Sequence, residues 1–262
     1  MSDMKSRWKA LRTSVTTRRF FFSAMGVISL ISAWYVVSLF VHSIVIASPQ
    51  DTLFSLIRMI RTERFWVHFF ISIRRIVSGI ILGGFAGFVL GLFAGLNEDI
   101  KHFLEPLRWT LTSVPAVVMV VMAMLWFGMG STMVIFITAL LLSPIVYVNT
   151  VKGLEMVDDS CIEMARVYNF SFGLKLRHVY IPAITAPLVS ALILLVGMGI
   201  RIVILAEIMG AAEGIGYAIS MNRSNLEIPA LCAWIVVCIA IVGFIEYLIL
   251  RPLEHYVLRW KE

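Results

Sequence analysis

Long uncharged runs alternate with short polar segments along this chain, and the runs predict membrane-spanning helices. No Asp, Glu, Lys or Arg occurs within residues 20–48, 76–96 or 109–151, and mainly apolar runs follow at 183–208 and 228–250. About 20 apolar residues cross the hydrocarbon core of a bilayer, and a Gly-Met-Gly-Ser segment at 128–131 divides the third run into two. We therefore expect an all-α membrane protein with six transmembrane helices.

The polar segments between these runs predict the domain organisation. Residues 1–19 are expected to form a cytoplasmic amino-terminal tail, and residues 20–66 the first span followed by an outer amphipathic segment at 52–60. Residues 67–250 then form a five-helix core, and residues 251–262 a cytoplasmic carboxyl-terminal tail. The first run is too long for the apolar region of a cleaved signal peptide, so we expect it to remain as a span. Pro115 and Pro144 are expected inside spans three and four.

The longest polar interruption in the second half of the chain, residues 160–182, predicts two short helices joined by a sharp turn. Ser160 and Glu163 have the spacing of a capping box, which begins a helix. Asn169 tolerates the left-handed backbone that closes a helix. Because proline restricts the residue before it, Ile181 and Pro182 are expected to end the second helix.

This segment resembles the cytoplasmic signature of ABC importer permeases, which reads Glu-Ala-Ala, three residues, Gly, nine residues, Ile, one residue, Leu-Pro. Glu163, Ala165 and Pro182 match it outright. In that family the segment docks on an ATPase, so the resemblance implies that residues 152–182 form a coupling loop; a merely solvated loop is the alternative. The coupling residues that it implies are Ser160, Glu163, Met164, Ala165, Asn169, Val179, Ile181 and Pro182.

Three further features are similar to the sulfonate, taurine and nitrate group of these permeases. They are a Ser-Pro before a short helix at 48–49, a Leu-Trp-Phe-Gly-Met-Gly turn at 125–130, and an Ala-Glu pair at 206–207 before an outer loop. The resemblance covers roughly residues 48–260. It implies the type I ABC importer permease fold, with short cytoplasmic coupling helices between spans four and five. It also implies a path for a small anionic solute across the bacterial cytoplasmic (inner) membrane.

The same resemblance implies the partners. They are two ATP-binding ATPase subunits, a second copy of this permease, a periplasmic or lipid-anchored substrate-binding protein, and the lipid bilayer. Because no segment matches GxxxxGK[ST], the chain is expected to bind no cofactor and to be no enzyme, and ATP and Mg²⁺ are expected on the partner ATPase.

Glycine recurs at every fourth position of the second run, and small residues at this spacing let another helix approach closely. A packing helix is therefore predicted, and a flexible gating helix is the alternative because glycine also eases bending. Arg74 and Arg75 precede this run and are expected to anchor its outer end. The packing glycines are Gly79, Gly83, Gly87, Gly91 and Gly95.

Composition and charge agree with a polytopic membrane protein. Hydrophobic residues make up 60% of the chain and charged residues 15%, with a mean hydropathy of +0.92, far from the average of soluble domains. Most of the 22 Lys and Arg fall in the two tails, the turn after span two and residues 152–182. Such an excess marks the cytoplasmic side, so both termini are expected there and nucleic acid is not an expected partner. The three cysteines show no metal-binding spacing, and no metal is expected.

Ionisable residues inside a span cost about 2.5–3.5 kcal/mol each, so they normally face a cavity or a partner. Arg201 departs from the family pattern, and it either reaches the translocation path and favours an anion or pairs with a carboxylate on another helix. For the hydroxyl residues, hydrogen bonding between helices is the alternative. The candidate path residues are Arg201, Glu207, Ser113, Thr138 and Ser143.

Two other functions compete with the importer permease. A secondary transporter driven by an ion gradient would use Glu207 or Glu246 as proton carrier, but the halves show no matching repeats or broken helices of the kind typical of such folds. An intramembrane enzyme would need a pair such as HExxH or GxSxG within a span, and the sequence has none.

Overall fold

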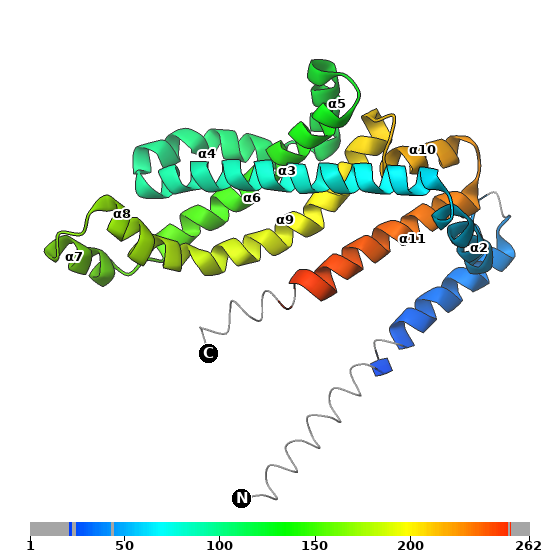
Figure 1. The fold of residues 1–262 in the computed structure, drawn as a ribbon, viewed down its shortest axis with the longest axis horizontal. Helices are drawn as coiled ribbons and strands as arrows, with labels where there is room; N and C mark the ends of the chain where they lie inside the picture. Colours follow the sequence, from blue (N-terminus) through cyan, green and yellow to red (C-terminus); the bar gives the residue numbers. More distant parts are fainter. Residues whose placement is uncertain (1–20, 23–24, 43–44, 251, 253–262) are drawn as a thin grey trace, which may run out of the picture. The chain divides into compact units, whose positions relative to one another are not determined.

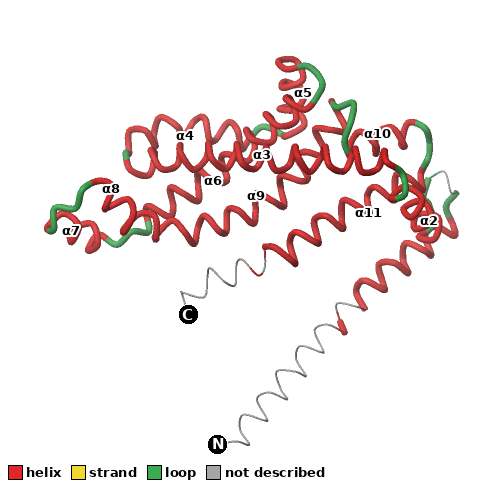
Figure 2. The backbone as a smooth tube through the Cα atoms, viewed as in Figure 1, coloured by secondary structure: helices red, strands yellow, loops and turns green. Residues whose placement is uncertain are grey.

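The computed structural model describes residues 21–22, 25–42, 45–250 and 252, and all regular secondary structure among them is helical (Figures 1 and 2). The predicted amino-terminal tail, and the carboxyl-terminal tail apart from residue 252, lie outside these residues. Close contacts divide the chain into two units, Met1–Met59 with Asn222–Ala233, and Ile60–Met221 with Trp234–Glu262.

The first unit contains the helix Met25–Phe40 and all but the last residue of α2, Pro49–Ile60. Ser48 begins α2, because its Oγ accepts a hydrogen bond from the Asp51 amide at 3.1 Å and donates one to Asp51 Oδ2 at 2.7 Å. The Trp34 indole donates to the Ala47 carbonyl oxygen at 3.1 Å, which ties the preceding helix to the segment before α2. The amphipathic helix predicted at 52–60 is present and begins three residues earlier.

Three long helices form the core of the second unit: α3, Glu63–Leu96; α6, Ser131–Glu155; and α9, Ile181–Gly210 (Figure 1). Leu142 and Val146 of α6 pack against Ala191 and Leu195 of α9, and all four are buried. The charged residues at 74–75 lie within α3 and do not interrupt it, because a helix continues wherever its backbone bonds are satisfied. The helix therefore begins thirteen residues before the predicted span.

The glycine stripe of α3 lies against α6 along most of its length. A methyl group built on Gly83 would lie 2.6 Å from the Ala139 carbonyl oxygen, and one on Gly91 would lie 2.9 Å from the Tyr147 carbonyl oxygen. Gly84 is outside the stripe, and a methyl group there would have ordinary contact, 3.7 Å from Leu195. The two backbones therefore approach closely at the stripe, as in other membrane helix pairs with small residues.

The structure differs from the prediction around the third span. A cytoplasmic turn was expected at 97–108 and a span from 109 with Pro115 inside it, but α4, Glu98–Ser113, and α5, Ala116–Phe127, are separate helices bent by 103°. Asn97 caps α4, since its side-chain oxygen accepts from the Asp99 amide at 2.8 Å. Pro115 lies in the break instead of inside a helix, and Val114 before it is extended, with ψ 130°, as the proline ring favours.

Pro144 lies inside α6, as predicted. A proline at this position leaves the carbonyl group four residues earlier, that of Leu140, without its usual amide donor. The Ser143 hydroxyl donates to the Leu140 oxygen at 3.0 Å, so the local sequence replaces the missing bond.

After α9 the chain forms α10, Ile215–Ser224, whose last residues belong to the first unit. The first residues of α11, Ile228–Phe244, also belong to the first unit, and η2, Ile245–Leu250, follows α11. By length and composition, four helices of the described chain can cross a bilayer: Glu63–Leu96, Ser131–Glu155, Gly173–Gly210 and Ile228–Tyr247. The bent α4 and α5 pair makes a fifth if it counts as one span. The helix Met25–Phe40 is apolar but shorter than these. The described residues thus contain four or five such spans, where six were expected.

Candidate functional site

The predicted coupling loop contains one separate short helix, α7, Asp159–Val167. The predicted capping box began the helix after Ser160. Ser160 is instead the second residue of α7, so this prediction is wrong. Asp158 is the cap, and its Oδ1 accepts from the Ser160 amide at 3.1 Å. Hydrogen bonds from Ser160, first from its backbone and then from its side chain, hold the pKa of Asp158 below its ordinary value. A carboxylate placed earlier in the chain thus takes an orphan amide at the start of the helix, that of Ser160.

Asn169 closes α7 with the left-handed backbone that the sequence predicts, at φ 52°. The Phe170 amide reaches back to the Ala165 carbonyl oxygen at 2.9 Å, and the Tyr168 amide bonds to Met164 at 3.0 Å. The first of these bonds defines the Schellman closure of a helix. Ala165 is only 1% exposed. The hydrogen bond that closes α7 is therefore accepted by a buried residue.

The second predicted helix does not end at Pro182. It comprises α8, Phe172–Lys175, and a π-helical turn, η1, Leu176–Tyr180, and runs directly into α9. The Ile181 amide bonds to the Leu176 carbonyl oxygen, five residues back. A π turn has space for an extra residue per ring, and Pro182 falls at the start of α9 where it needs no amide donor. One helix therefore runs from Gly173 to Gly210.

Most of the signature residues are accessible in this arrangement. Of the implied coupling residues, Ala165 is buried and Val179 is half-buried, and the exposed members are Ser160, Glu163, Met164, Asn169, Ile181 and Pro182. The loop thus leaves six of the eight implied coupling residues exposed and buries Ala165.

The five candidate path residues occupy different surroundings, and in the described chain no hydrogen bond or ion pair joins any two of them. Arg201 is exposed on α9 and forms no ion pair with another described residue, and Ser113 is exposed at the end of α4. Thr138 is buried and donates to the Val134 carbonyl oxygen at 2.7 Å, and Ser143 serves the proline site described above. Their role in a substrate path stays a prediction.

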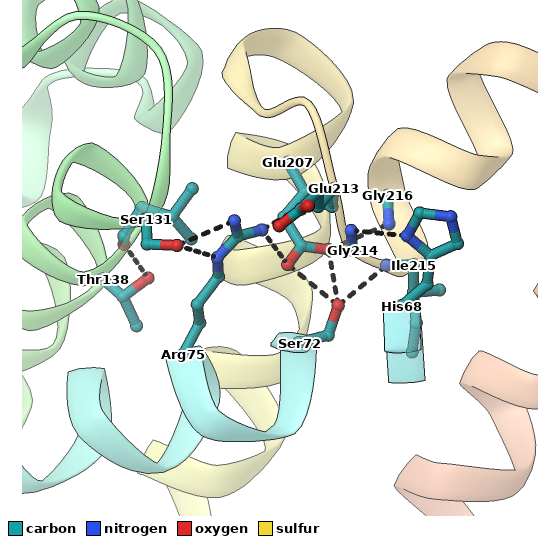
Figure 3. A network of polar contacts seen from close by, with 11 residues as sticks. His68, Ser72, Arg75, Ser131, Thr138, Glu207, Glu213, Gly214, Ile215 and Gly216 are labelled. Atoms are coloured by element: carbon teal, nitrogen blue, oxygen red, sulfur yellow. Dashed lines mark hydrogen bonds and ion pairs between the residues drawn. The ribbon is translucent and has the colours of Figure 1, made fainter. Parts of the chain in front are cut away.

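Glu207 is the centre of a buried polar network at the end of α9 (Figure 3). Its carboxylate pairs with Arg75 of α3 at 2.7 Å and accepts the Ser72 hydroxyl at 2.8 Å from each oxygen. The Gly216 amide donates to the same carboxylate at 2.9 Å. Arg75 also donates from Nε and Nη2 to Ser131 Oγ, at 3.0 and 2.9 Å, and to the Glu213 carbonyl oxygen at 2.7 Å.

The same network holds the loop that follows α9. The Ile215 amide donates to Ser72 Oγ at 2.8 Å, and the Gly214 amide donates to His68 Nδ1 at 3.1 Å. Gly214 has φ 108°, and a methyl group on it would collide with the Glu207 carboxylate, so the loop needs glycine there. Figure 3 shows His68, Ser72 and Arg75 directed from α3 toward this loop.

Arg75 corrects the sequence interpretation, which placed it as an interfacial anchor. The residue is 2% exposed and is paired inside the protein. A buried charge needs a partner and further hydrogen bonds, and the network supplies both. Its partner lies 132 positions away in the sequence, and no local spacing indicates such a pair. The only signal for this pair in the sequence was that Arg75 lies beside one predicted span and Glu207, of opposite charge, lies in another.

The described residues contain no group of three or more His, Cys, Asp or Glu placed to hold a metal ion.

Comparison with known proteins places this architecture in a family. Residues 87–255 match the family described as binding-protein-dependent transport system inner membrane component. The putative aliphatic sulfonates transport permease protein SsuC of Bacillus subtilis is 29% identical over 221 residues, 84% of this chain and 80% of the relative. The taurine transport system permease protein TauC of Escherichia coli is 24% identical over 238 residues, 88% of this chain and 86% of the relative.

Solved structures share the fold. A structure of the MetNI methionine ABC transporter in an inward-facing conformation contains a chain with a TM-score of 0.58 at 17% identity, covering 71% of this chain and 94% of that chain. A chain from a crystal structure of an amino acid ABC transporter gives 0.55 at 15% identity, covering 72% and 92%. The family match extends over well more than half of the sequence, and the chain therefore belongs to the binding-protein-dependent transport system inner membrane components, the multi-pass permeases of ABC importers.

Proposed function

We propose that this chain forms the translocation path of an ABC importer for a small anionic solute such as a sulfonate, taurine or nitrate. The observation that carries the proposal is the exposed signature segment at 160–182, where a short helix ends at Asn169 and the chain then enters a helix that runs from Gly173 to Gly210. The names of the sulfonate and taurine permeases among the relatives support the solute class.

The assembly that fits this role contains two copies of the permease, two ATPase subunits and a periplasmic or lipid-anchored substrate-binding protein, in the bacterial inner membrane. ATP and Mg²⁺ bind on the ATPase subunits, which carry out the hydrolysis. Six spans follow if the helix Met25–Phe40 and the bent α4 and α5 pair each count as one. Both termini and the coupling loop then lie in the cytoplasm.

Coupling in this assembly works through α7. The exposed Glu163 and Met164 face the ATPase, and Ala165 is buried within the permease. When ATP binding closes the ATPase pair, α7 moves with its docking surface, and the continuous helix that ends in α9 carries the motion into the bundle. The permease thereby alternates between inward-open and outward-open states.

Arg201 supports an anionic solute. It is exposed on α9, within a helix that is long and apolar enough to cross a membrane, and no described carboxylate pairs with it. A cation in such a position is costly unless it faces water or a ligand. In a pair of permeases the two Arg201 side chains would face one shared path and attract an anion.

The coupling role is tested with Glu163→Ala in the complete complex, reconstituted in proteoliposomes with the ATPase and the binding protein. We expect unchanged assembly with solute uptake reduced about tenfold per ATP hydrolysed, because a hydrogen bond to a charged group contributes about 1.5–3 kcal/mol. Glu227→Ala, an exposed glutamate between α10 and α11, is the matched control.

Normal uptake and hydrolysis by Glu163→Ala would contradict this coupling role. Uptake by the permease alone, driven by an ion gradient, would contradict the whole proposal and favour a secondary transporter.

The anion preference is tested in the same vesicles with Arg201→Met and Arg201→Lys. We expect Arg201→Met to lower sulfonate uptake several-fold and Arg201→Lys to retain most of it, because the charge is what attracts the solute. Equal uptake by the Met variant and the unmodified chain would remove Arg201 from the path.

A further inference from the structure

A second polar site lies at the opposite end of the core helices from the Glu207 network. The end of α6 and the facing part of α4 border a cleft of about 330 Å³. Since α6 ends at Glu155, this cleft lies at the end of the bundle where the coupling loop begins. The polar residues that line it are Lys101, Glu105, Arg108, Tyr147, Lys152 and Glu155.

The residues that line the cleft carry three positive and two negative charges. Lys101 pairs with Glu155 at 2.9 Å and, outside the lining, with Glu98 at 3.4 Å, and Arg108 pairs with Glu105 through its Nε and Nη2. Lys152 forms no ion pair with any described residue, so it is the one cation of the lining without a carboxylate partner. Arg108 also keeps its Nη1 free of hydrogen bonds within the described chain, although a guanidinium group has five donors. The lining therefore has unused donors and a net positive charge.

Tyr147 adds a buried donor at the same place. The residue is 6% exposed, and its hydroxyl is buried with no hydrogen-bond partner among the described residues. Buried hydroxyl groups are usually satisfied, and one that is not costs free energy until an acceptor reaches it. An oxygen of an anion held in the cleft would be such an acceptor.

A narrow apolar cavity adjoins the cleft. It has a volume of about 30 Å³ and shares Arg108 and Tyr147 with the cleft. The rest of its lining is mainly leucine, contributed by Leu90, Leu104, Leu107 and Leu111. The apolar cavity has room only for a methylene group or two, so the two compartments, which meet at the same two residues, match an oxyanion with a short aliphatic group beside it.

We propose that the two compartments form a binding site for an oxyanion that carries an aliphatic chain. Lys152, Arg108 and the Tyr147 hydroxyl bind the oxygens of the head group, and the leucines of the narrow cavity contact the chain. Aliphatic sulfonates and anionic phospholipids share this chemistry. The placement of the site on the cytoplasmic side rests on the proposed function, whereas the binding itself does not.

Binding is measured on the purified full chain in a neutral detergent, without ATPase. One arm titrates 1-butanesulfonate by calorimetry, with butylammonium as a probe of opposite charge. The other arm measures retention of phosphatidylglycerol against phosphatidylcholine by native mass spectrometry. The variants are Lys152→Gln, Lys152→Arg and Tyr147→Phe, and Arg61→Gln, in the exposed turn before α3, is the matched loss of one positive charge.

We expect selective binding of one of the two anionic probes, weakened about tenfold by Lys152→Gln and about threefold by Tyr147→Phe. Lys152→Arg and Arg61→Gln are expected to bind like the unmodified chain. Saturable butanesulfonate binding would identify the solute as the source, and selective phosphatidylglycerol retention would identify the lipid.

Failure to bind either anion would overturn the proposal, as would equal binding by Lys152→Gln and Arg61→Gln. Neither result would affect the test of Glu163 in the transporting complex. Conversely, a chain that binds the anion but supports no ATP-driven uptake would overturn the proposed function and leave this site in place.

Discussion

The two ends of the core helices both carry arginine and glutamate, but they use them differently. At one end Arg75 and Glu207 are almost fully buried, and the pair is bonded to serine hydroxyls, backbone amides and a carbonyl oxygen. At the other end the charged residues line an open cleft, where Lys152 is unpaired within the described chain and the Tyr147 hydroxyl is unsatisfied. A complete network holds a structure in place, whereas an incomplete one has capacity left for a ligand.

The loops at the two ends differ in the same way. The loop after α9 is fixed by side chains of α3, through the bonds from Gly214 to His68 and from Ile215 to Ser72. Within the described chain, the loop around α7 makes local hydrogen bonds, between residues 154 and 175. We infer that the first end is the fixed part of the bundle and the second is the part that responds to a partner.

The largest effect is expected from breaking the buried pair. Arg75→Met leaves the Glu207 carboxylate buried without its counter-charge, and the loss of one partner of a buried pair costs about 3–5 kcal/mol. The expected result is a lower midpoint of thermal unfolding for the full chain in detergent. The double variant Arg75→Met with Glu207→Met is expected to recover part of the loss, because no unpaired charge remains.

The matched control is Glu213→Gln, since Glu213 is exposed and contributes only its backbone oxygen to Arg75. Equal midpoints for Arg75→Met and Glu213→Gln would show that the network does not stabilise this end.

The glycine seam between the two ends gives the next largest effect. Gly83→Ala places a methyl group against the Ala139 backbone, and overpacking of this kind costs about 1–3 kcal/mol. Gly84→Ala is the control, because it has the same change in helix propensity and an ordinary contact at 3.7 Å. Unfolding midpoints of the two variants measure the difference. If Gly83→Ala were as stable as Gly84→Ala, α3 and α6 would have to separate more easily than their contact indicates.

A smaller effect is expected at the turn after α7. Asn169→Val puts a β-branched side chain at φ 52°, and left-handed backbone costs such residues about 1–2 kcal/mol. Asn169→Gly removes the strain, so it is expected to keep the turn. The measurement is amide hydrogen exchange at Phe170, whose amide bonds to Ala165. Faster exchange in the Gly variant than in the Val variant would contradict this account of the turn.

The smallest effect concerns the charge that caps α7. The folded-state pKa of Asp158 is lowered by its bonds to Ser160, so its contribution is present above the unfolded pKa and is lost as the pH falls through the folded value. Asp158→Asn caps without titrating. Exchange of the Ser160 amide, compared between the two chains at each pH, is expected to diverge only on acidification. A constant ratio across that range would exclude a role for the charge.

The sequence predicted the helical class, the apolar runs and the left-handed turn at Asn169, because each depends on local composition or on one residue's backbone preference. It misplaced the start of α3, since charges at 74–75 were interpreted as the end of a membrane segment although they do not interrupt a helix. Asn97 carried a readable signal for the start of α4, in its capping side chain, but the polar residues after it suggested a turn.

Other features could not be predicted from local patterns. The 103° bend at Pro115 depends on how α4 and α5 pack against the other helices. A proline inside an apolar run does not predict this bend, because such a proline is equally compatible with a single kinked span. Pro182 was expected to end a helix, but a wider π turn before it lets the helix continue. The pairing of Arg75 with Glu207 joins α3 to α9, and a single sequence contains no information on which distant charges meet.

The helix from Gly173 to Gly210 has a mechanical consequence. With a rise of 1.5 Å per residue it extends roughly 57 Å, so a swing of about 3° about its far end displaces its near end by roughly 3 Å. In the coupling proposed above, Glu207 and its bonds to α3 hold one end of this helix, and the residues next to Asn169 lie at the end that moves. Over this length, a slight angular change would turn a small displacement at that end into an opening between neighbouring helices.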